Sequence, residues 1–421
     1  MSRGRNWGSR SPAGARDIVE DVRATIEAVA RDSYGRLIAY LAARTRDVAG
    51  AEDALCDALL AALATWPRDG VPHKPEAWLL ATARRRLIDR ARHDQVRTAS
   101  ASTLELLTEE ANETVADKFP DERLKLLFVC AHPAIDASVH TPLMLQSVLG
   151  LDAARIAQAF LVSPTAMGQR LVRAKAKIRD TGIAFEVPEE RELPQRLDAV
   201  IEAIYAAYGS GWEDAAGADP RRHGLTGEAI RLARLLAQQL PREPEARGLL
   251  ALMLHCEARR SARRTPDGRY VPLSEQDVQL WSMPMIEEAE RELAYAAKLG
   301  RAGRFQLEAA IQSVHAERAH TGRTDWQAIA SFYGGLVQLA PTLGACVGRA
   351  AATAEVNGPE AGLALLNEME VAVVAAYQPY WAVRAHLLKK LAHESEASEA
   401  FDHAIGLAED GAVRRFLLEQ R

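Results

Sequence analysis

Residues 150–179, GLDAARIAQAFLVSPTAMGQRLVRAKAKIR, contain the pattern that decides the architecture of this part of the chain. Asp152 precedes an Ala-rich helical stretch, and Ser163 with Pro164 marks the start of a second helix, because Ser favours the N-cap and Pro the first helical position. Only the short break at Leu161–Val162 separates the two helices. Two helices across so short a turn predict a helix-turn-helix arrangement.

The second helix has two distinct faces. At 100° per residue, Met167, Leu171, Ala174 and Ile178 form one apolar stripe, which predicts a buried face. Polar and basic side chains occupy the other face and its shoulders, as in a helix that contacts base edges and phosphates. The predicted DNA-contacting residues are Thr165, Gln169, Arg170, Arg173, Lys175 and Lys177. A solvated amphipathic helix without a ligand remains the alternative.

This basic helix stands in an acidic chain. The 421 residues have a formal net charge of −5, so the positive charge is local and not a property of the whole protein. Ala and Leu dominate and β-branched runs are scarce, which predicts an all-α fold. The length suits two or three domains, each with its own core.

Residues 17–97 are predicted to form a first helical domain, with one apolar stripe at Leu55, Leu59, Leu63 and Trp66. Its last helix starts near Pro75. In that helix Arg84 falls on the apolar stripe, so we interpret it as structural and paired with Asp53 or Asp57, since a buried charge is costly without a partner. Arginines outside the stripe are candidates for nucleic-acid contact or, alternatively, part of a solvated basic face; they are Arg85, Arg86, Arg90 and Arg92.

The remaining segments follow from composition. Residues 1–16 are predicted to be a disordered basic tail. Residues 98–122, with seven acids against one lysine, are predicted to be an acidic linker before the domain at 123–187.

Residues 188–421 contain paired helices. Segments starting at 325, 360 and 396 share a small–large apolar pattern at a spacing close to the tetratricopeptide period. Residues 263–270, RRTPDGRY, predict a hairpin between helices, with partner binding as the alternative.

Several classes of function are excluded by what the sequence lacks. No apolar run approaches the length of a membrane span, and no apolar segment follows the N-terminal arginines, so neither a membrane protein nor a signal peptide is expected. Four widely spaced cysteines argue against a disulfide framework or a zinc site and for a reducing cytoplasm. No phosphate-binding glycine loop, nucleophile elbow or metal-ligand cluster is present, so we expect no enzymatic activity and no cofactor.

The first 188 residues resemble the extracytoplasmic-function sigma factors of bacterial RNA polymerase. AEDALCDALLAALATW (51–66) is similar to sigma region two, and EAWLLATARRRLIDRARH (76–93) to the helix that engages the minus-ten promoter element. Residues 150–179 are similar to region four, which recognises the minus-thirty-five element. The resemblance implies promoter DNA and core RNA polymerase as partners, through the clamp coiled coil of the largest subunit and the flap region. It places polymerase contacts at Glu52, Asp53, Cys56 and Asp57.

The rest of the chain resembles the subgroup of these sigma factors that has a C-terminal tetratricopeptide-like extension. Residues 227–263 and 304–317 are its most specific segments. The resemblance implies that this extension regulates activity, with a regulatory protein partner as a further possibility. Two other hypotheses stay open: a stand-alone helix-turn-helix regulator whose repeats sense a ligand or peptide, and a scaffold. A second basic helical unit at 17–97 favours the sigma factor over the stand-alone regulator, and the Ser163–Pro164 start and the turn of the 152–179 unit argue against the scaffold.

Overall fold

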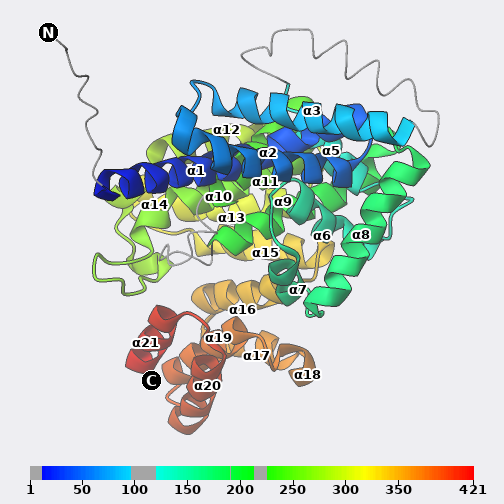
Figure 1. The fold of residues 1–421 in the computed structure, drawn as a ribbon. Coiled ribbons are helices and arrows are strands. Elements are labelled where there is room, and N and C mark those ends of the chain that lie inside the picture. Colours follow the sequence, from blue (N-terminus) through cyan, green and yellow to red (C-terminus); the bar gives the residue numbers. More distant parts are fainter. Residues whose placement is uncertain (1–11, 96–119, 190, 213–224) are drawn as a thin grey trace, which may run out of the picture. The chain divides into compact units, whose positions relative to one another are not determined.

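The protein is all-α in the computed structural model, which describes residues 12–95, 120–189, 191–212 and 225–421 (Figure 1). Within these ranges the only β-type pairing is an isolated bridge between Arg264 and Tyr270. The described chain divides into two compact units. The first holds the described residues up to Ser210 together with residues 225–232, and the second holds residues 233–421.

Helices in the first unit start with α1 and end with the first half of α10. Their bounds are α1 (Pro12–Thr45), α2 (Val48–Asp69), α3 (Pro75–Gln95), α5 (Arg123–Cys130), α6 (Ala137–Ser147), α7 (Ala153–Ala159), α8 (Pro164–Thr181), α9 (Leu193–Trp212) and α10 (Leu225–Gln239). The predicted all-α class and the start of a helix at Pro75 are confirmed. Residues 12–16, expected in the tail, are part of α1, whereas most of the predicted acidic linker lies outside the described residues.

The helices α1, α2 and α3 pack on one another around an apolar core. Leu37, Leu55 and Trp66 are almost fully buried there, and the ring of Trp66 meets that of Trp78 edge to face, with centroids 5.4 Å apart. One predicted core position differs, because Leu63 is 44% exposed. It lies on the outer side of α2, where no other described helix of this unit covers it.

A second group, α5 to α8, buries Leu126, Leu127, Phe128 and Leu143, and its first helix also packs on α1. The buried Arg196 of α9 donates a hydrogen bond through Nε to the backbone carbonyl of Phe128, at 3.1 Å. Arg123 of α5 forms ion pairs with Asp121 and with Glu228 of α10. These contacts attach α9 and the start of α10 to the first unit, so the boundary expected at residue 188 lies inside it.

The second unit is a succession of helices packed on their sequence neighbours. In it α11 packs on α12 and α13, α15 on α16, α16 on α17, and α19 on α20. Bounds are α11 (Pro244–Ala258), η1 (Arg260–Ala262), η2 (Leu273–Glu275), η3 (Val278–Leu280), α12 (Met283–Lys298), α13 (Arg304–Ala316), α14 (Arg318–Thr321), α15 (Trp326–Leu339), α16 (Leu343–Asn357), α17 (Pro359–Asn367), α18 (Val371–Val374), α19 (Gln378–Lys390), α20 (Glu394–Leu407) and α21 (Gly411–Gln420).

The predicted hairpin at 263–270 is confirmed. Thr265 N donates to the carbonyl of Arg269 at 3.0 Å, and Gly268 has a φ of 81°, which a residue without Cβ adopts at little cost. The hairpin contacts the last helix of the unit, because the Arg264 guanidinium pairs with the Asp410 carboxylate and the rings of Tyr270 and Phe416 meet edge to face. Arg264 therefore has an intramolecular partner.

Candidate nucleic-acid interface

The helix pair α7–α8 is built by the residues that predicted it. The Asp152 carboxylate accepts a hydrogen bond from Arg155 N at 2.9 Å, and the Ser163 hydroxyl accepts one from Ala166 N at 3.2 Å. Pro164 is the first residue of α8. Leu161, in the turn, has a φ of 52° and is 94% exposed. Both predicted caps and the short turn are confirmed.

The apolar face of α8 is buried, as the sequence predicted. Met167, Leu171, Ala174 and Ile178 are all buried, and α8 packs on α7, α6 and α2. Five of the six predicted DNA-contacting side chains are exposed, namely Thr165, Gln169, Arg170, Arg173 and Lys177. The surface of α8 thus presents two polar residues near its N-terminus, followed by three cations.

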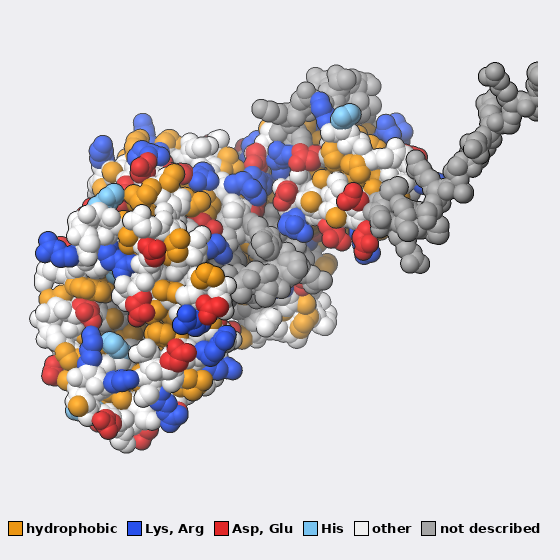
Figure 2. All heavy atoms as spheres, turned by 90° about the vertical axis from the view of Figure 1, so that its left-hand side faces the viewer, with side chains coloured by type: hydrophobic (Ala, Val, Ile, Leu, Met, Phe, Trp, Pro, Cys, Tyr) orange, Lys and Arg blue, Asp and Glu red, His pale blue; other side chains and the backbone are white. Residues whose placement is uncertain are grey.

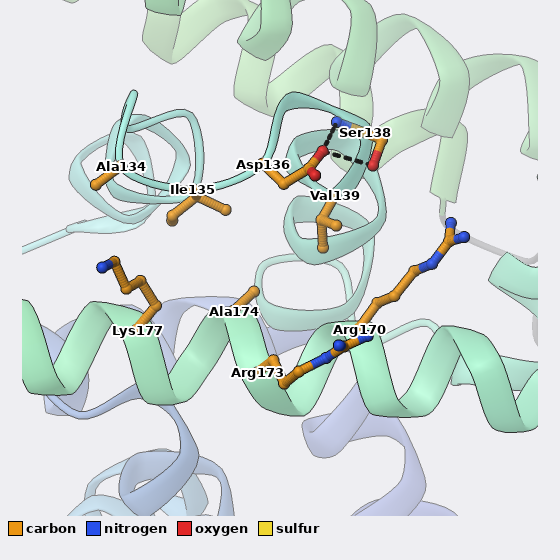
Figure 3. A pocket seen from close by; sticks show the side chains of 9 residues that line it. All are labelled: Ala134, Ile135, Asp136, Ser138, Val139, Arg170, Arg173, Ala174 and Lys177. Carbon is orange, nitrogen blue, oxygen red and sulfur yellow. Dashed lines mark hydrogen bonds between the residues drawn. The ribbon is translucent and has the colours of Figure 1, made fainter.

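Those three cations line a pocket of about 350 Å³ (Figure 3). Arg170, Arg173 and Lys177 form one wall from α8. The other wall is formed by Ala134, Ile135, Asp136, Ser138 and Val139. Asp136 is engaged as the N-cap of α6, since its carboxylate accepts from Ser138 N at 2.8 Å and from Ser138 Oγ at 2.6 Å. These hydrogen bonds from Ser138 hold the pKa of Asp136 below its usual value.

Lys175 is the exception among the predicted contacts on α8. Its side chain is only 8% exposed, and its ammonium pairs with the Glu52 carboxylate of α2, with Nζ 2.5 Å from Oε2. The shoulder position inferred from helical periodicity is therefore covered by another helix. In this conformation Lys175 is not accessible to a nucleic acid. Glu52 is only partly accessible to a protein partner.

On α3 the four arginines proposed for nucleic-acid contact, Arg85, Arg86, Arg90 and Arg92, are all exposed. Arg90 forms two ion pairs with α2, to Asp53 at 3.1 Å and to Asp57 at 3.3 Å. Exposed pairs of this kind contribute little stability, so Arg90 can exchange partners. Arg84 is buried as predicted, and its guanidinium donates to the Tyr40 hydroxyl.

The outer face of α2 combines acids with exposed apolar side chains. Asp53 and Cys56 are exposed, and Leu60 and Leu63, one and two turns further on, are 64% and 44% exposed. Although Cys56 is exposed overall, partial burial of its thiol, followed by the charges of Asp53, Glu52 and Asp57, raises the pKa of that thiol, so it stays protonated at neutral pH. Sequence reasoning selected the acids but missed Leu60, although positions 53, 56, 60 and 63 share one helical face.

The described part of the chain contains neither a cluster of metal-ligating side chains nor a helix that could span a membrane. No group of three His, Cys, Asp or Glu side chains there is arranged to hold a metal ion. Burial raises the pKa of Cys130, which keeps that thiol protonated. None of the described helices combines the length and the apolar character needed to cross a membrane.

Surface charge is mixed elsewhere. On the face shown in Figure 2, Lys and Arg side chains alternate with Asp and Glu over the described surface, without a broad field of either sign. The local row of cations on α8 is therefore a better guide to an anionic partner than the overall charge.

Comparisons with known proteins match both ends of the first unit and the start of the second. Residues 29–97 match the model of sigma-70 region 2, and residues 196–297 match a family of unknown function (DUF6596). The chain is 38% identical over 395 residues to an uncharacterised protein of Rhizobium meliloti (strain 1021), and the alignment covers 92% of each chain. No solved structure matches the chain.

Proposed function

We propose that this chain, whose residues 29–97 match sigma-70 region 2, is a promoter-specific initiation factor of the extracytoplasmic-function type. It binds core RNA polymerase, directs it to particular promoters, and carries a C-terminal helical unit that modulates its activity. The observation that carries the proposal is the presence in one compact unit of a sigma-70 region 2 match and of the exposed polar and basic face of α8.

Support for polymerase binding comes from α2. An exposed helical face with apolar Leu60 and Leu63 beside Asp53 and Asp57 is suited to a partner helix that offers both apolar and basic side chains. In the sigma-factor interpretation, this partner is the clamp coiled coil of the largest polymerase subunit. Cys56 lies within the contact, and its protonated thiol acts there as a small apolar side chain.

DNA recognition is supported by the order of residues along α8. Thr165 and Gln169 stand near the N-terminus of the helix, where a major-groove helix contacts base edges. Arg173 follows on the same face and can donate two hydrogen bonds to a guanine. Arg170 and Lys177, on the pocket wall, are placed to neutralise phosphates. Arg85, Arg86 and Arg92 on α3 supply a second basic surface for the minus-ten element.

For the C-terminal unit we propose a tetratricopeptide-like regulatory domain. Helices that pack on their sequence neighbours are the pattern of repeat domains, which bind partners on a concave surface. A groove of about 700 Å³ lies in this unit, lined by Trp326, Tyr333 and His386 among others. This groove is the candidate site for a regulatory protein partner.

The test is transcription in vitro with bacterial core polymerase and the full-length chain on a library of promoter fragments. We expect transcripts from a restricted set of promoters, and weaker transcription with Arg173→Ala from those promoters that carry the guanine it recognises. The control is Arg179→Ala, because Arg179 is exposed on the same helix but pairs with its neighbour Asp180. A chain that binds duplex DNA alone and never binds core polymerase would instead be a stand-alone regulator, and the sigma proposal would be wrong.

A further inference from the structure

We propose that the groove of the second unit binds an acidic segment of a partner protein, in which an aromatic side chain stands next to carboxylates. The inference rests on the proposed function, which takes this groove as the site of a regulatory partner, and it adds the chemistry of the segment bound there. The groove is built by α13 to α16, by α19 and by η2, all of them in the second unit.

One part of the groove is aromatic. The rings of His315 and Trp326 meet edge to face, with centroids 5.5 Å apart, and Tyr333 follows about two turns further along α15. Burial, followed by the charges of Arg259 and Arg318, lowers the pKa of His315 to about 4, so its ring is neutral at pH 7. An uncharged aromatic lining favours an apolar side chain in the ligand, and above all an aromatic one.

Small residues of α16 line the groove beside these rings. They are Gly348, Ala351 and Ala352. A Cβ on Gly348 would lie 2.4 Å from the ring of Tyr333, so the ring rests directly against the backbone of α16. The groove therefore keeps its shape here only while position 348 has no side chain.

Two arginines give the groove a positive charge that no described carboxylate neutralises. Arg318 donates to the backbone carbonyls of Ser274 and Gln276, and it forms no ion pair among the described residues. Arg259 is buried, donates to the amide oxygen of Gln312, and also has no ion pair there. Burial and the nearby Arg259 guanidinium lower the pKa of Arg318, which shows that the two charges are close. This end of the groove therefore attracts carboxylates.

A third cation, Lys390, can exchange its partner. Its Nζ lies 2.9 Å from Oε1 of Glu355, and the two side chains are 43% and 37% exposed. Exposed ion pairs contribute little stability, so a carboxylate of the ligand can take the place of Glu355. Glu355 itself lines the groove, and its charge opposes an acidic ligand.

The rim of the groove is held in place before any ligand binds. Leu273 and Ser274 of η2 form this rim, and the hydrogen bond from Arg318 fixes the Ser274 carbonyl. The hairpin that precedes η2 is attached to the end of the unit by the ion pair of Arg264 with Asp410. A site that is already formed loses less conformational entropy on binding, so a short segment can bind to it.

The first experiment titrates the full-length chain with a short acetylated and amidated peptide in which Phe stands between two Glu-Asp pairs. Selective ¹⁵N labelling gives one indole N–H signal for each of the seven tryptophans, and the signal lost in Trp326→Phe belongs to the groove. Three matched peptides replace Phe by Ala, the acids by their amides, or the acids by Lys. We expect the acidic aromatic peptide to shift the Trp326 signal and to bind at least about tenfold more tightly than each of the others.

The second experiment repeats the titration with variants of the groove. Lys390→Gln should weaken binding of the acidic peptide about two- to fivefold, whereas Glu355→Gln should tighten it by about as much because a competing carboxylate is removed. Arg318→Gln should weaken it at least about tenfold. Arg301→Gln is the matched control, since Arg301 is exposed outside the groove and also donates to a backbone carbonyl, and it should leave binding unchanged. If Arg318→Gln does not fold, the exposed pair of Lys390 and Glu355 decides the outcome.

Several results would overturn the proposal. They are equal binding of the four peptides, preference for the neutral or the Lys peptide, and changes of the same sign in Lys390→Gln and Glu355→Gln. Binding of free N-acetylphenylalanine as tightly as the acidic peptide would assign the groove to a small aromatic acid and not to a protein segment. No polymerase is present in these titrations. A chain that binds the acidic peptide but supports no transcription would therefore refute only the initiation-factor proposal.

Discussion

Glu52 and Lys175, 123 residues apart in the sequence, form an ion pair buried between α2 and α8. One residue belongs to the region 2 match and the other to the predicted DNA-contacting helix. Their contact joins the two helical groups of the first unit, and it assigns to Lys175 a role that its position along α8 did not predict.

Removing one member of this pair should cost more than removing both. Lys175→Met leaves the Glu52 carboxylate without its cation, and we expect a loss of about 3 kcal/mol in the free energy of unfolding. The double variant Glu52→Gln with Lys175→Met should recover most of that loss, because two neutral groups need no counter-charge. Urea unfolding of the four members of the cycle gives the coupling energy; additive losses would show that the pair is not coupled.

Arg173 and Lys177 should fail in different ways. If Arg173 recognises a guanine, Arg173→Ala should weaken promoters that carry that base by about 1–3 kcal/mol and relax discrimination at one position. Lys177→Ala should weaken all promoters alike and lower the slope of log K against log salt by about 1. Binding of holoenzyme to matched and single-base-changed promoters at several salt concentrations separates the two. Equal losses for Arg173→Ala on every promoter would assign it to a phosphate.

The exposed apolar face of α2 gives a prediction about polymerase. Leu60→Asp should weaken core polymerase binding at least about tenfold, since it places a charge in the apolar centre of an interface. Stability should change by no more than about 0.5 kcal/mol, because Leu60 is 64% exposed. Leu339→Asp is the matched control, a leucine that is 52% exposed in the second unit. Competition binding and thermal unfolding distinguish the variants, and equal effects of both would exclude a specific α2 contact.

Acid should destabilise the second unit through His255. Burial and the nearby Arg259 guanidinium lower the pKa of His255 to about 3, although the Glu290 carboxylate lies 3.3 Å away. In the unfolded chain this histidine binds a proton below about pH 6.5, whereas in the folded chain it stays neutral until the pH is near 3. Its contribution to stability is therefore fully present above about pH 6.5 and is lost as the pH falls toward 3.

Between pH 7 and pH 5 this one histidine should cost about 2 kcal/mol, and His255→Gln should remove that part of the dependence. Hydrogen exchange of the α11 amides at both pH values, corrected for intrinsic rates, is the measurement. Burial and the Arg259 guanidinium lower the pKa of His315 to about 4. His315 would therefore maintain part of the dependence of stability on pH in the His255→Gln variant. An unchanged slope in His255→Gln would contradict the assignment.

Gly303 and Glu245 give a test of the packing in the second unit. The Glu245 carboxylate accepts hydrogen bonds from Phe305 N at 2.9 Å and Gln306 N at 3.2 Å, and so caps α13 from another helix. A Cβ on Gly303 would lie 2.1 Å from Cδ of Glu245, so Gly303→Ala should displace the cap and cost about 1–2 kcal/mol.

Gly406→Ala is the control for that substitution. Gly406 lies inside α20 with open space around its Cα, so alanine there should stabilise the chain by about 0.5–1 kcal/mol. Thermal unfolding of the two variants should therefore shift in opposite directions. A stabilising Gly303→Ala would show that the Glu245 cap contributes nothing.

The sequence by itself determined the local features of this protein. Asp152, Ser163 and Pro164 predicted the ends of α7 and α8 because caps depend on neighbouring residues only, and helical periodicity predicted the buried stripe of α8. The tertiary structure alone decided which shoulder of α8 is covered. Lys175 and Lys177 are both lysines of one helix, yet Lys175 is buried against the Glu52 carboxylate while Lys177 is exposed.

The difference between local pattern and tertiary packing also explains which residues pair with Asp53 and Asp57 of α2 and why Leu63 is exposed. Periodicity assigns a side chain to a face of its own helix, but it does not say which other helix, if any, covers that face. Asp53 and Asp57 bind Arg90, whereas Arg84, their partner in the sequence-based prediction, donates to the Tyr40 hydroxyl; Leu63 stays at the surface. Contacts between residues far apart in the chain depend on how the helices assemble, and no local pattern encodes that geometry.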